Sequence, residues 1–244
     1  MATDSPAETS KLIPVRMVSG AAPLTTVFRR SRAMTAFMRY VFLVLCLWGG
    51  AAAAQAPSQA PKILAFGDSL SAAYGIQASQ GWVALLQQRL RQEGYPHVVV
   101  NASISGETSA GGLARLPAAL GQHKPAIVLL ELGANDGLRA LPVKNLRANL
   151  EKMLQLSRNA GARTLLFEMR IPANYGPAYG ESFTRTFTEL GQATKTPVVP
   201  FFLMPIALDP VNFQDDGIHP SAAAQPKLLE AVWPTLKALL GPPR

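Results

Sequence analysis

The sequence predicts an α/β protein whose centre is one parallel sheet of five strands. From residue 62 onward, short apolar runs alternate with longer amphipathic stretches, a pattern typical of strands joined by crossover helices. Four of the five apolar runs are nearly continuous, as expected for strands that helices cover on both faces. At 244 residues the chain suits one domain with a sizeable core. The expected strands occupy residues 62–66, 97–101, 126–132, 163–168 and 198–201.

Amphipathic stretches between and after these strands predict five helices. Four stretches are followed closely by glycine, which readily adopts the left-handed conformation found at helix C-termini. A fifth helix is expected over residues 225–240, where Pro226 falls in the first turn and Pro234 predicts a kink. The irregular stretch 203–221 is long for a compact domain, and such stretches are usually functional. The four helices with their glycines are 82–92 with Gly94, 111–120 with Gly121, 143–159 with Gly161, and 179–190 with Gly191.

The N-terminal segment, residues 1–54, is expected to be an extension ending in a signal peptide, followed by one domain over residues 55–244. Arg39 precedes an apolar run over residues 40–48, which leads through two glycines into four alanines, the order of an export signal. The run is shorter than the roughly 20 apolar residues that span a bilayer, which disfavours a retained anchor. We therefore expect a periplasmic or secreted protein.

The alanine-rich end of this segment offers two cleavage sites. Cleavage after Ala54 gives a mature chain that begins at Gln55, and this site is preferred. Cleavage after Ala56 also satisfies the small-residue rule, but it places Pro57 directly after the scissile bond. The candidate start residues are Met1, Met34 and Met38.

Charge and cysteine content exclude several classes of function. Half of the net charge of +8 lies in residues 1–54, and the rest of the chain has 17 basic and 13 acidic side chains without basic runs. Nucleic-acid binding is therefore not expected. Cys46, the only cysteine, lies in the segment expected to be removed, and Leu45 stands where a lipoprotein signal needs a small residue. Without a thiol or a phosphate-binding glycine motif, we expect no metal, no cofactor and an oxygen nucleophile.

Polar and glycine residues follow four of the predicted strands. Ligands of an open parallel sheet bind beyond the carboxyl ends of its strands, so these residues meet at one edge. Ser69 is the candidate nucleophile, and its hydroxyl requires a base to take its proton. His219 is the candidate base, because the other two histidines lie at a strand start and a helix end. Asp216, three positions before it, is the candidate carboxylate to orient the imidazole, in preference to Asp215.

A tetrahedral intermediate would also need hydrogen-bond donors for its oxyanion, each worth roughly 3 to 4 kcal/mol. The candidates are the backbone N–H groups of Ser69 and Gly106 and the side-chain amide of Asn135. Asp68 and Asp136 are expected to brace their turns. Each segment alone suits an ordinary turn, but the complete set in order along one edge favours catalysis.

These segments resemble the SGNH or GDSL hydrolase superfamily, in its branch of bacterial periplasmic acyl-CoA thioesterase I, lysophospholipase L1 and arylesterases. They read ILAFGDSLS at 63–71, NASISGET at 101–108, ELGANDG at 131–137 and QDDGIHP at 214–220. The resemblance implies a three-layer flavodoxin-like fold and cleavage of esters and thioesters through an acyl-enzyme on Ser69. It also implies the roles given above for Gly106, Asn135, Asp216 and His219. The α/β-hydrolase elbow Gly-x-Ser-x-Gly is absent, since Ser71 takes the place of its second glycine.

The expected partners are small acyl esters and thioesters, with lysophospholipid as a further candidate, and we expect a monomer. One alternative is a carbohydrate acetyl esterase on the same fold. Two others are a noncatalytic binding protein and a peripheral membrane protein. The apolar residues expected to line an acyl groove are Ile76, Leu138, Ile171, Pro172 and Tyr175.

Overall fold

A parallel sheet of five strands lies at the centre of the computed structural model, which describes residues 60–243. The strands follow the order β2-β1-β3-β4-β5, and every neighbouring pair is parallel. The predicted α/β class and five-stranded parallel sheet are therefore confirmed. The segments 1–54 and 55–59 lie outside the described residues. The strands are β1 Lys62–Gly67, β2 Val98–Asn101, β3 Ile127–Glu131, β4 Arg163–Phe167 and β5 Val198–Val199.

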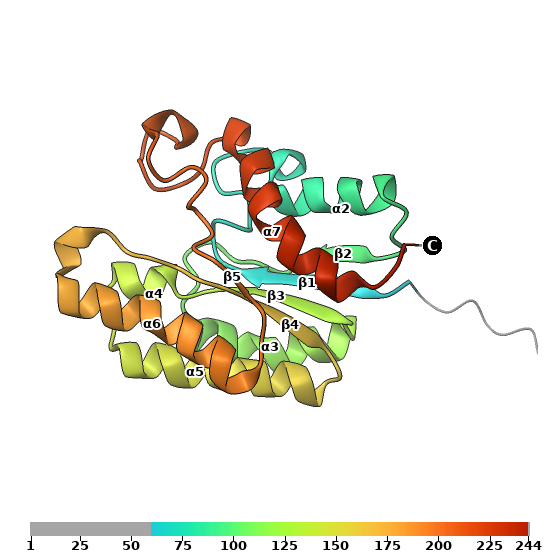
Figure 1. Ribbon diagram of the computed structural model, residues 1–244, viewed down its shortest axis with the longest axis horizontal. Helices are drawn as coiled ribbons and strands as arrows, with labels where there is room; N and C mark the ends of the chain where they lie inside the picture. The colour runs from blue at the N-terminus through green and yellow to red at the C-terminus, as the bar shows by residue number, and fades with distance from the viewer. Residues whose placement is uncertain (1–59, 244) are drawn as a thin grey trace, which may run out of the picture. The chain divides into compact units, whose positions relative to one another are not determined.

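Helices cover both faces of the sheet and give three layers (Figure 1). The helices α2 and α7 pack together on one face, whereas α3, α5 and α6 lie on the other, with α5 between its two neighbours. The short helix α4 follows β3 directly and is absent from the sequence prediction. The helices are α2 Trp82–Gln92, α3 Ser109–His123, α4 Ala134–Leu138, α5 Val143–Asn159, α6 Pro177–Thr194 and α7 Gln225–Leu240. Short 3-10 helices occupy Ala78–Gln80, Ala173–Tyr175, Pro210–Asn212 and Ala222–Ala224.

The two central strands explain the continuous apolar runs. Residues 63–66 of β1 and 127–130 of β3 are completely buried, because helices cover both of their faces. The apolar positions of the helices recur every three or four residues and face this sheet, as in α5 with Leu146, Leu150 and Met153. Among the described residues, the resulting hydrophobic core extends from Ile63 to Leu240.

Two of the four predicted glycine caps are confirmed. Gly94 and Gly161 follow α2 and α5 with φ of +76° and +79°, the left-handed conformation that glycine adopts without steric cost. In both cases the next residue donates a backbone hydrogen bond into the last helical turn, from Tyr95 to Leu90 and from Ala162 to Ser157.

The other two predicted caps are wrong. The helices α3 and α6 run through Gly121 and Gly191 and are capped by Lys124 and Lys195, which themselves adopt φ of +47° and +55°. A Cβ on Gly191 would overlap the side chain of Val198 in β5, so this glycine permits close packing of helix on strand. Glycine therefore has two meanings near a helix end, and sequence alone does not separate them.

The connections that follow the strands gather at the carboxyl edge of the sheet. The longest of them, residues 200–224, runs from β5 to α7 and projects beyond this edge in orange to red (Figure 1). Pro226 lies in the first turn of α7, as predicted, and Pro234 lies in its interior. Within residues 60–243, no helix combines the length and apolar character that crossing a membrane requires.

Candidate active site

The serine turn, residues 67–71, continues directly from buried strand β1. Ser69 is partly buried, and the turn is closed by backbone hydrogen bonds from Ser71 and Ala72 to the Asp68 carbonyl. The Asp68 carboxylate also accepts from the Leu70 amide at 3.0 Å, an arrangement typical of aspartate in tight turns. The turn therefore presents Ser69 at the carboxyl edge from a rigid strand.

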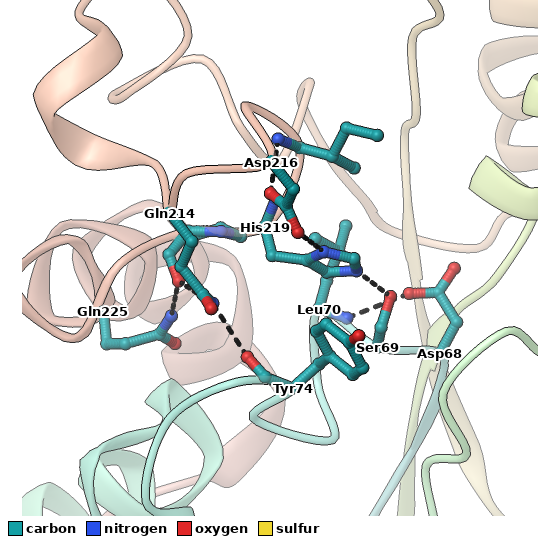
Figure 2. Close-up of polar contacts among 10 residues, drawn as sticks. Asp68, Ser69, Leu70, Tyr74, Gln214, Asp216, His219 and Gln225 are labelled. Atoms are coloured by element: carbon teal, nitrogen blue, oxygen red, sulfur yellow. Dashed lines mark hydrogen bonds and ion pairs between the residues drawn. The ribbon is translucent and has the colours of Figure 1, made fainter.

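The histidine loop, residues 214–220, places an imidazole against this serine (Figure 2). His219 Nε2 lies 2.9 Å from Ser69 Oγ, and His219 Nδ1 lies 2.6 Å from Asp216 Oδ2. The other carboxylate oxygen, Asp216 Oδ1, accepts from the backbone N–H groups of Ile218 and His219, both at 2.9 Å. Of the two neighbouring aspartates, Asp216 is the one that contacts the imidazole.

These hydrogen bonds keep the Asp216 carboxyl group ionised. Donation from the backbone N–H and then from the side chain of His219 lowers the pKa of Asp216 to about 2. A carboxylate at this position favours the tautomer of His219 that carries its proton on Nδ1. Nε2 is then free to accept the proton of Ser69.

Gln214 and Tyr74 connect the histidine loop to the serine turn (Figure 2). The Gln214 side chain donates from Nε2 to the Tyr74 carbonyl at 2.8 Å and to the Pro220 carbonyl at 3.1 Å. The Tyr74 amide in turn donates to the Ser69 carbonyl, and its ring lies 4.4 Å from the imidazole ring of His219. Gln214 and Tyr74 thus link segments that are 140 residues apart in the sequence.

The turn after Tyr74 is shaped to admit Gln214. Gly75 has φ of +73°, and a Cβ at this position would overlap the Gln214 carboxamide oxygen. A further glutamine, Gln225 at the start of α7, accepts from the Trp82 amide at 3.0 Å. Its Nε2 reaches the Pro220 and Ser221 carbonyls at 3.4 Å. Tyr74, Gln214 and Gln225 are not among the site residues predicted from the sequence.

The three candidate oxyanion donors lie on three neighbouring connections. Gly106, with φ of +78°, sits in the connection after β2, where its carbonyl accepts from Arg139 at 3.0 Å. Asn135, on α4 after β3, donates from Nδ2 to Asp68 at 3.0 Å. Among residues 60–243, the backbone N–H groups of Ser69 and Gly106 donate to no other residue, so both are available to a ligand.

Two buried carboxyl groups hold the serine turn in place: Asp68 within the turn and Glu131 in the neighbouring strand β3. Glu131, at the end of β3, accepts from the Ser71 hydroxyl at 2.6 Å and from the Asp68 amide at 3.3 Å. Burial raises the pKa of Asp68 to about 6, and burial together with the charge of Asp68 raises the pKa of Glu131 well above its ordinary value. A Cβ on Gly67 would overlap the Glu131 carboxyl, which is why the turn begins with glycine.

Both aspartates expected to brace turns do so. Asp68 ties the Leu70 amide to the side chain of Asn135, as described above. Asp136 accepts from the amide and the hydroxyl of Ser109 at 2.7 and 2.6 Å, which anchors the start of α3 to α4. Neither carboxyl group contacts Ser69 or His219 in the hydrogen bonds of the described residues.

The structure brings together three of the five residues expected to line an acyl groove. The Tyr175 hydroxyl donates to the Leu138 carbonyl at 2.7 Å, and Ile171 packs on Gly137, where a Cβ would overlap it. Ile76 lies in the connection after β1, and Pro172 is exposed. None of the five lines the hollow of about 410 Å³ between α2 and α7, so that hollow does not correspond to the expected groove.

The fold and this geometry define a class of α/β enzyme with a serine, a histidine and a carboxylate linked at the carboxyl edge of a parallel sheet. The GDSL-like lipase/acylhydrolase family matches residues 65–225, and the chain belongs to this family. It is therefore a serine ester hydrolase, and the predicted resemblance is confirmed. No group of three or more potential metal ligands occurs in the described part of the chain.

Relatives of known structure or name support this assignment. The chain is 54% identical over 203 residues to the esterase TesA of Pseudomonas aeruginosa, covering 83% of this chain and 100% of that protein. It is 43% identical over 201 residues to thioesterase 1/protease 1/lysophospholipase L1 of Escherichia coli, covering 82% and 92% of the two chains. A crystal structure of TesA matches with a TM-score of 0.72 at 56% identity and covers 73% of this chain and 99% of that one.

Proposed function

We propose that this protein cleaves carboxylic esters and thioesters through an acyl-enzyme on Ser69, with His219 as general base and Asp216 as the group that orients it. The observation that supports the assignment most strongly is the continuous chain from Asp216 Oδ2 through the imidazole to Ser69 Oγ, with steps of 2.6 and 2.9 Å. This is the arrangement that activates a serine hydroxyl.

In the first half of the reaction, Ser69 Oγ attacks the acyl carbonyl while His219 Nε2 takes the hydroxyl proton. The new C–O bond gives a tetrahedral intermediate, and its negative charge develops on the former carbonyl oxygen. His219 then gives its proton to the leaving alkoxide or thiolate as the bond to the leaving group breaks. Water repeats the sequence on the acyl-enzyme, releasing the carboxylic acid and restoring Ser69.

The oxyanion would be stabilised by the N–H groups of Ser69 and Gly106 and by one Nδ2 hydrogen of Asn135. The other Nδ2 hydrogen is held by Asp68 at 3.0 Å, which fixes the orientation of the amide. Donors that are held in place before the reaction stabilise the transition state without reorganising.

The substrate class follows from the names of the relatives and from the apolar residues at the edge. The Escherichia coli relative is named for thioesterase and lysophospholipase activities, and the Pseudomonas aeruginosa relative is an esterase. An acyl groove formed by Leu138, Ile171 and Tyr175, with Ile76 and Pro172, would discriminate each methylene by only about 1 to 3 kcal/mol. We therefore expect the enzyme to accept acyl chains of many lengths. We also expect lysophospholipid to be among its substrates.

We further propose that the enzyme acts outside the cytoplasm as one domain over residues 55–244. The pattern of Arg39, the apolar run 40–48 and the following alanines supports export with cleavage after Ala54. N-terminal sequencing of the protein recovered from the periplasm or medium should give Gln55 as the first residue. An intact N-terminus in a membrane fraction would indicate a retained anchor instead.

The proposed activity is tested with p-nitrophenyl esters and acyl-CoA thioesters of two to sixteen carbons. The chain from Gln55 should hydrolyse both series, and Ser69→Ala should lose the activity. Ser79→Ala is the matched control, because Ser79 is an exposed serine outside the site. Activity confined to acetyl esters would favour a carbohydrate esterase, and a folded but inactive protein would favour a binding role.

A further inference from the structure

The most exposed large apolar side chains of residues 60–243 lie at the edge of the sheet that holds the candidate active site. Six of them have between 47% and 94% of their surface exposed, and all six lie in connections that follow the carboxyl ends of strands. Val98 and Leu141 are the next in exposure, at 43% and 36%. We call the six the apolar rim: Tyr74, Ile104, Met204, Leu208, Val211 and Ile218.

The outermost part of the rim is an ordered segment. Leu208 and Val211 are 94% and 75% exposed, yet Ile206 and Asn212 beside them are almost completely buried. The Asp209 carboxylate accepts from the Val211 amide at 3.2 Å and caps the short helix there. These anchors hold the connection in the projecting position seen in Figure 1, so the exposure of Leu208 and Val211 is a feature of the fold.

Three other rim residues lie beside the serine turn or the imidazole. Ile218 directly precedes His219, and the Tyr74 ring lies against the imidazole (Figure 2). The Ile104 amide donates to the Gly67 carbonyl at the start of the serine turn. A protein partner that covered these three residues would close off Ser69. The partner that suits this surface is one that supplies substrate as it binds.

An aggregate of lipid-like acyl esters is such a partner, and the distribution of charge on the protein indicates which kind of lipid surface fits. The connection from residue 200 to 224 has three carboxylates and no lysine or arginine. The other connections of the carboxyl edge add Arg139 and Arg170, and Arg170 is paired with Glu168. The opposite edge of the sheet, where strands begin, has Lys62, Lys124, Arg163 and Lys195. An anionic membrane would attract that opposite edge and turn the active site away from the lipid. A zwitterionic surface imposes no such orientation, so the apolar rim determines how the enzyme docks.

We propose that the apolar rim docks the enzyme onto zwitterionic lipid aggregates, with Leu208 and Val211 entering the lipid. The inference rests on the proposed function, because docking in this orientation presents Ser69 to amphiphilic acyl esters held in the aggregate. Burial of exposed apolar side chains supplies the binding free energy, as in other proteins that lie at a membrane interface.

Binding is measured by cosedimentation with phosphatidylcholine vesicles, using the chain from Gln55 with Ser69→Ala so that turnover does not intervene. The variant Leu208→Ser/Val211→Ser should bind roughly 10- to 100-fold more weakly, because two exposed apolar side chains are lost. Val98→Ser, an exposed apolar position at the opposite edge, is the matched control and should bind as the parent does. Equal binding of the double variant and the parent would overturn the proposal, as would binding to phosphatidylglycerol vesicles alone.

Comparing the turnover of a monomeric ester with that of an aggregated lipid distinguishes a failure of the docking proposal from a failure of the proposed function. In the chain with Ser69 intact, Leu208→Ser/Val211→Ser should hydrolyse monomeric p-nitrophenyl acetate within about twofold of the parent. Its turnover of lysophosphatidylcholine above the micellar concentration should fall roughly 10-fold or more. Loss of both activities together, or of neither, would overturn the docking role.

An inactive parent that still binds the vesicles would contradict the proposed function and leave docking supported. Sedimentation that shows a dimer dissociated by the double variant would assign the rim to a second copy of the chain.

Discussion

The two segments that meet at Ser69 are held in place in contrasting ways. The serine turn is held by buried groups: Asp68 within it and Glu131 of β3 are completely enclosed, and Ser71 is nearly so. The histidine loop lies at the surface, and the Asp216 side chain is 38% exposed. Packing on β1 and β3 positions the nucleophile, whereas hydrogen bonds accepted by Asp216 and donated by Gln214 and Gln225 position the base. Changes in the serine turn should therefore alter stability, and changes in the histidine loop should alter activity alone.

The largest effect is expected for Asp216→Asn. An amide removes the charge that orients and stabilises the imidazolium, so kcat/KM should fall roughly 10³- to 10⁴-fold on p-nitrophenyl butyrate. The melting temperature should change little, since the carboxylate is partly exposed. Asp215→Asn is the matched control, because Asp215 is the adjacent exposed aspartate. A comparable loss in both variants would contradict the assignment of Asp216.

The next effect is expected at the oxyanion donor. Asn135→Ala should lower kcat roughly 10²- to 10³-fold with a small change in KM, because the donor acts on the transition state. Asp68→Asn should lower kcat about 10-fold, because it weakens the contact that orients Asn135. The double variant should be no slower than Asn135→Ala alone, as a cycle of pH-matched kinetic measurements would show. Additive losses would mean that Asp68 acts on another group.

Stability in the serine turn should depend on pH in a defined direction. The pKa of Asp68 in the folded protein, about 6, lies above its ordinary value of 3.8, and the pKa of Glu131 is raised as well. The folded state therefore binds more protons than the unfolded state in this range. The associated stability is present below about pH 4 and is lost as pH rises through about 6.

Glu131→Gln tests this dependence. The amide keeps an oxygen acceptor for the Ser71 hydroxyl but removes the buried charge, so the free energy of unfolding at pH 8 should rise by about 1 to 3 kcal/mol. Urea unfolding at pH 4, 6 and 8 should show a smaller loss with pH than in the parent. Glu151→Gln on the exposed face of α5 is the control and should leave the pH dependence unchanged. A steeper loss in Glu131→Gln would contradict the assigned protonation.

The smallest effect is expected for Gln214→Ala. Without the contacts to the Tyr74 and Pro220 carbonyls, the histidine loop is less well positioned, and kcat should fall about 10-fold. The downfield proton resonance of the hydrogen bond between His219 and Asp216 should broaden, whereas the melting temperature should be nearly unchanged. Gln192→Ala, an exposed glutamine on α6, should have neither effect. An unchanged resonance together with full activity would remove Gln214 from the positioning of the base.

The parts of the structure that could be predicted are those set by short-range patterns. Continuous apolar runs identify β1 and β3, and turn residues after the strands locate Ser69, Asn135 and Asp216 at one edge. The roles of Gln214 and Tyr74 could not be predicted, because their contact joins segments 140 residues apart. Gly75, directly after Tyr74, indicates from sequence that the backbone there is turned or closely approached. That the approaching group is the Gln214 side chain is visible only in the folded structure.

The role of Ser69 is tested most directly by covalent labelling with a p-nitrophenyl alkylphosphonate, which traps a serine nucleophile. The chain from Gln55 should release one equivalent of p-nitrophenolate, and peptide mass spectrometry should place the phosphonyl group on Ser69. Asp216→Asn should be labelled far more slowly at the same residue, and Ser69→Ala should not be labelled. A label on another residue, or equal labelling of Ser69→Ala, would contradict the assignment of Ser69 as the nucleophile.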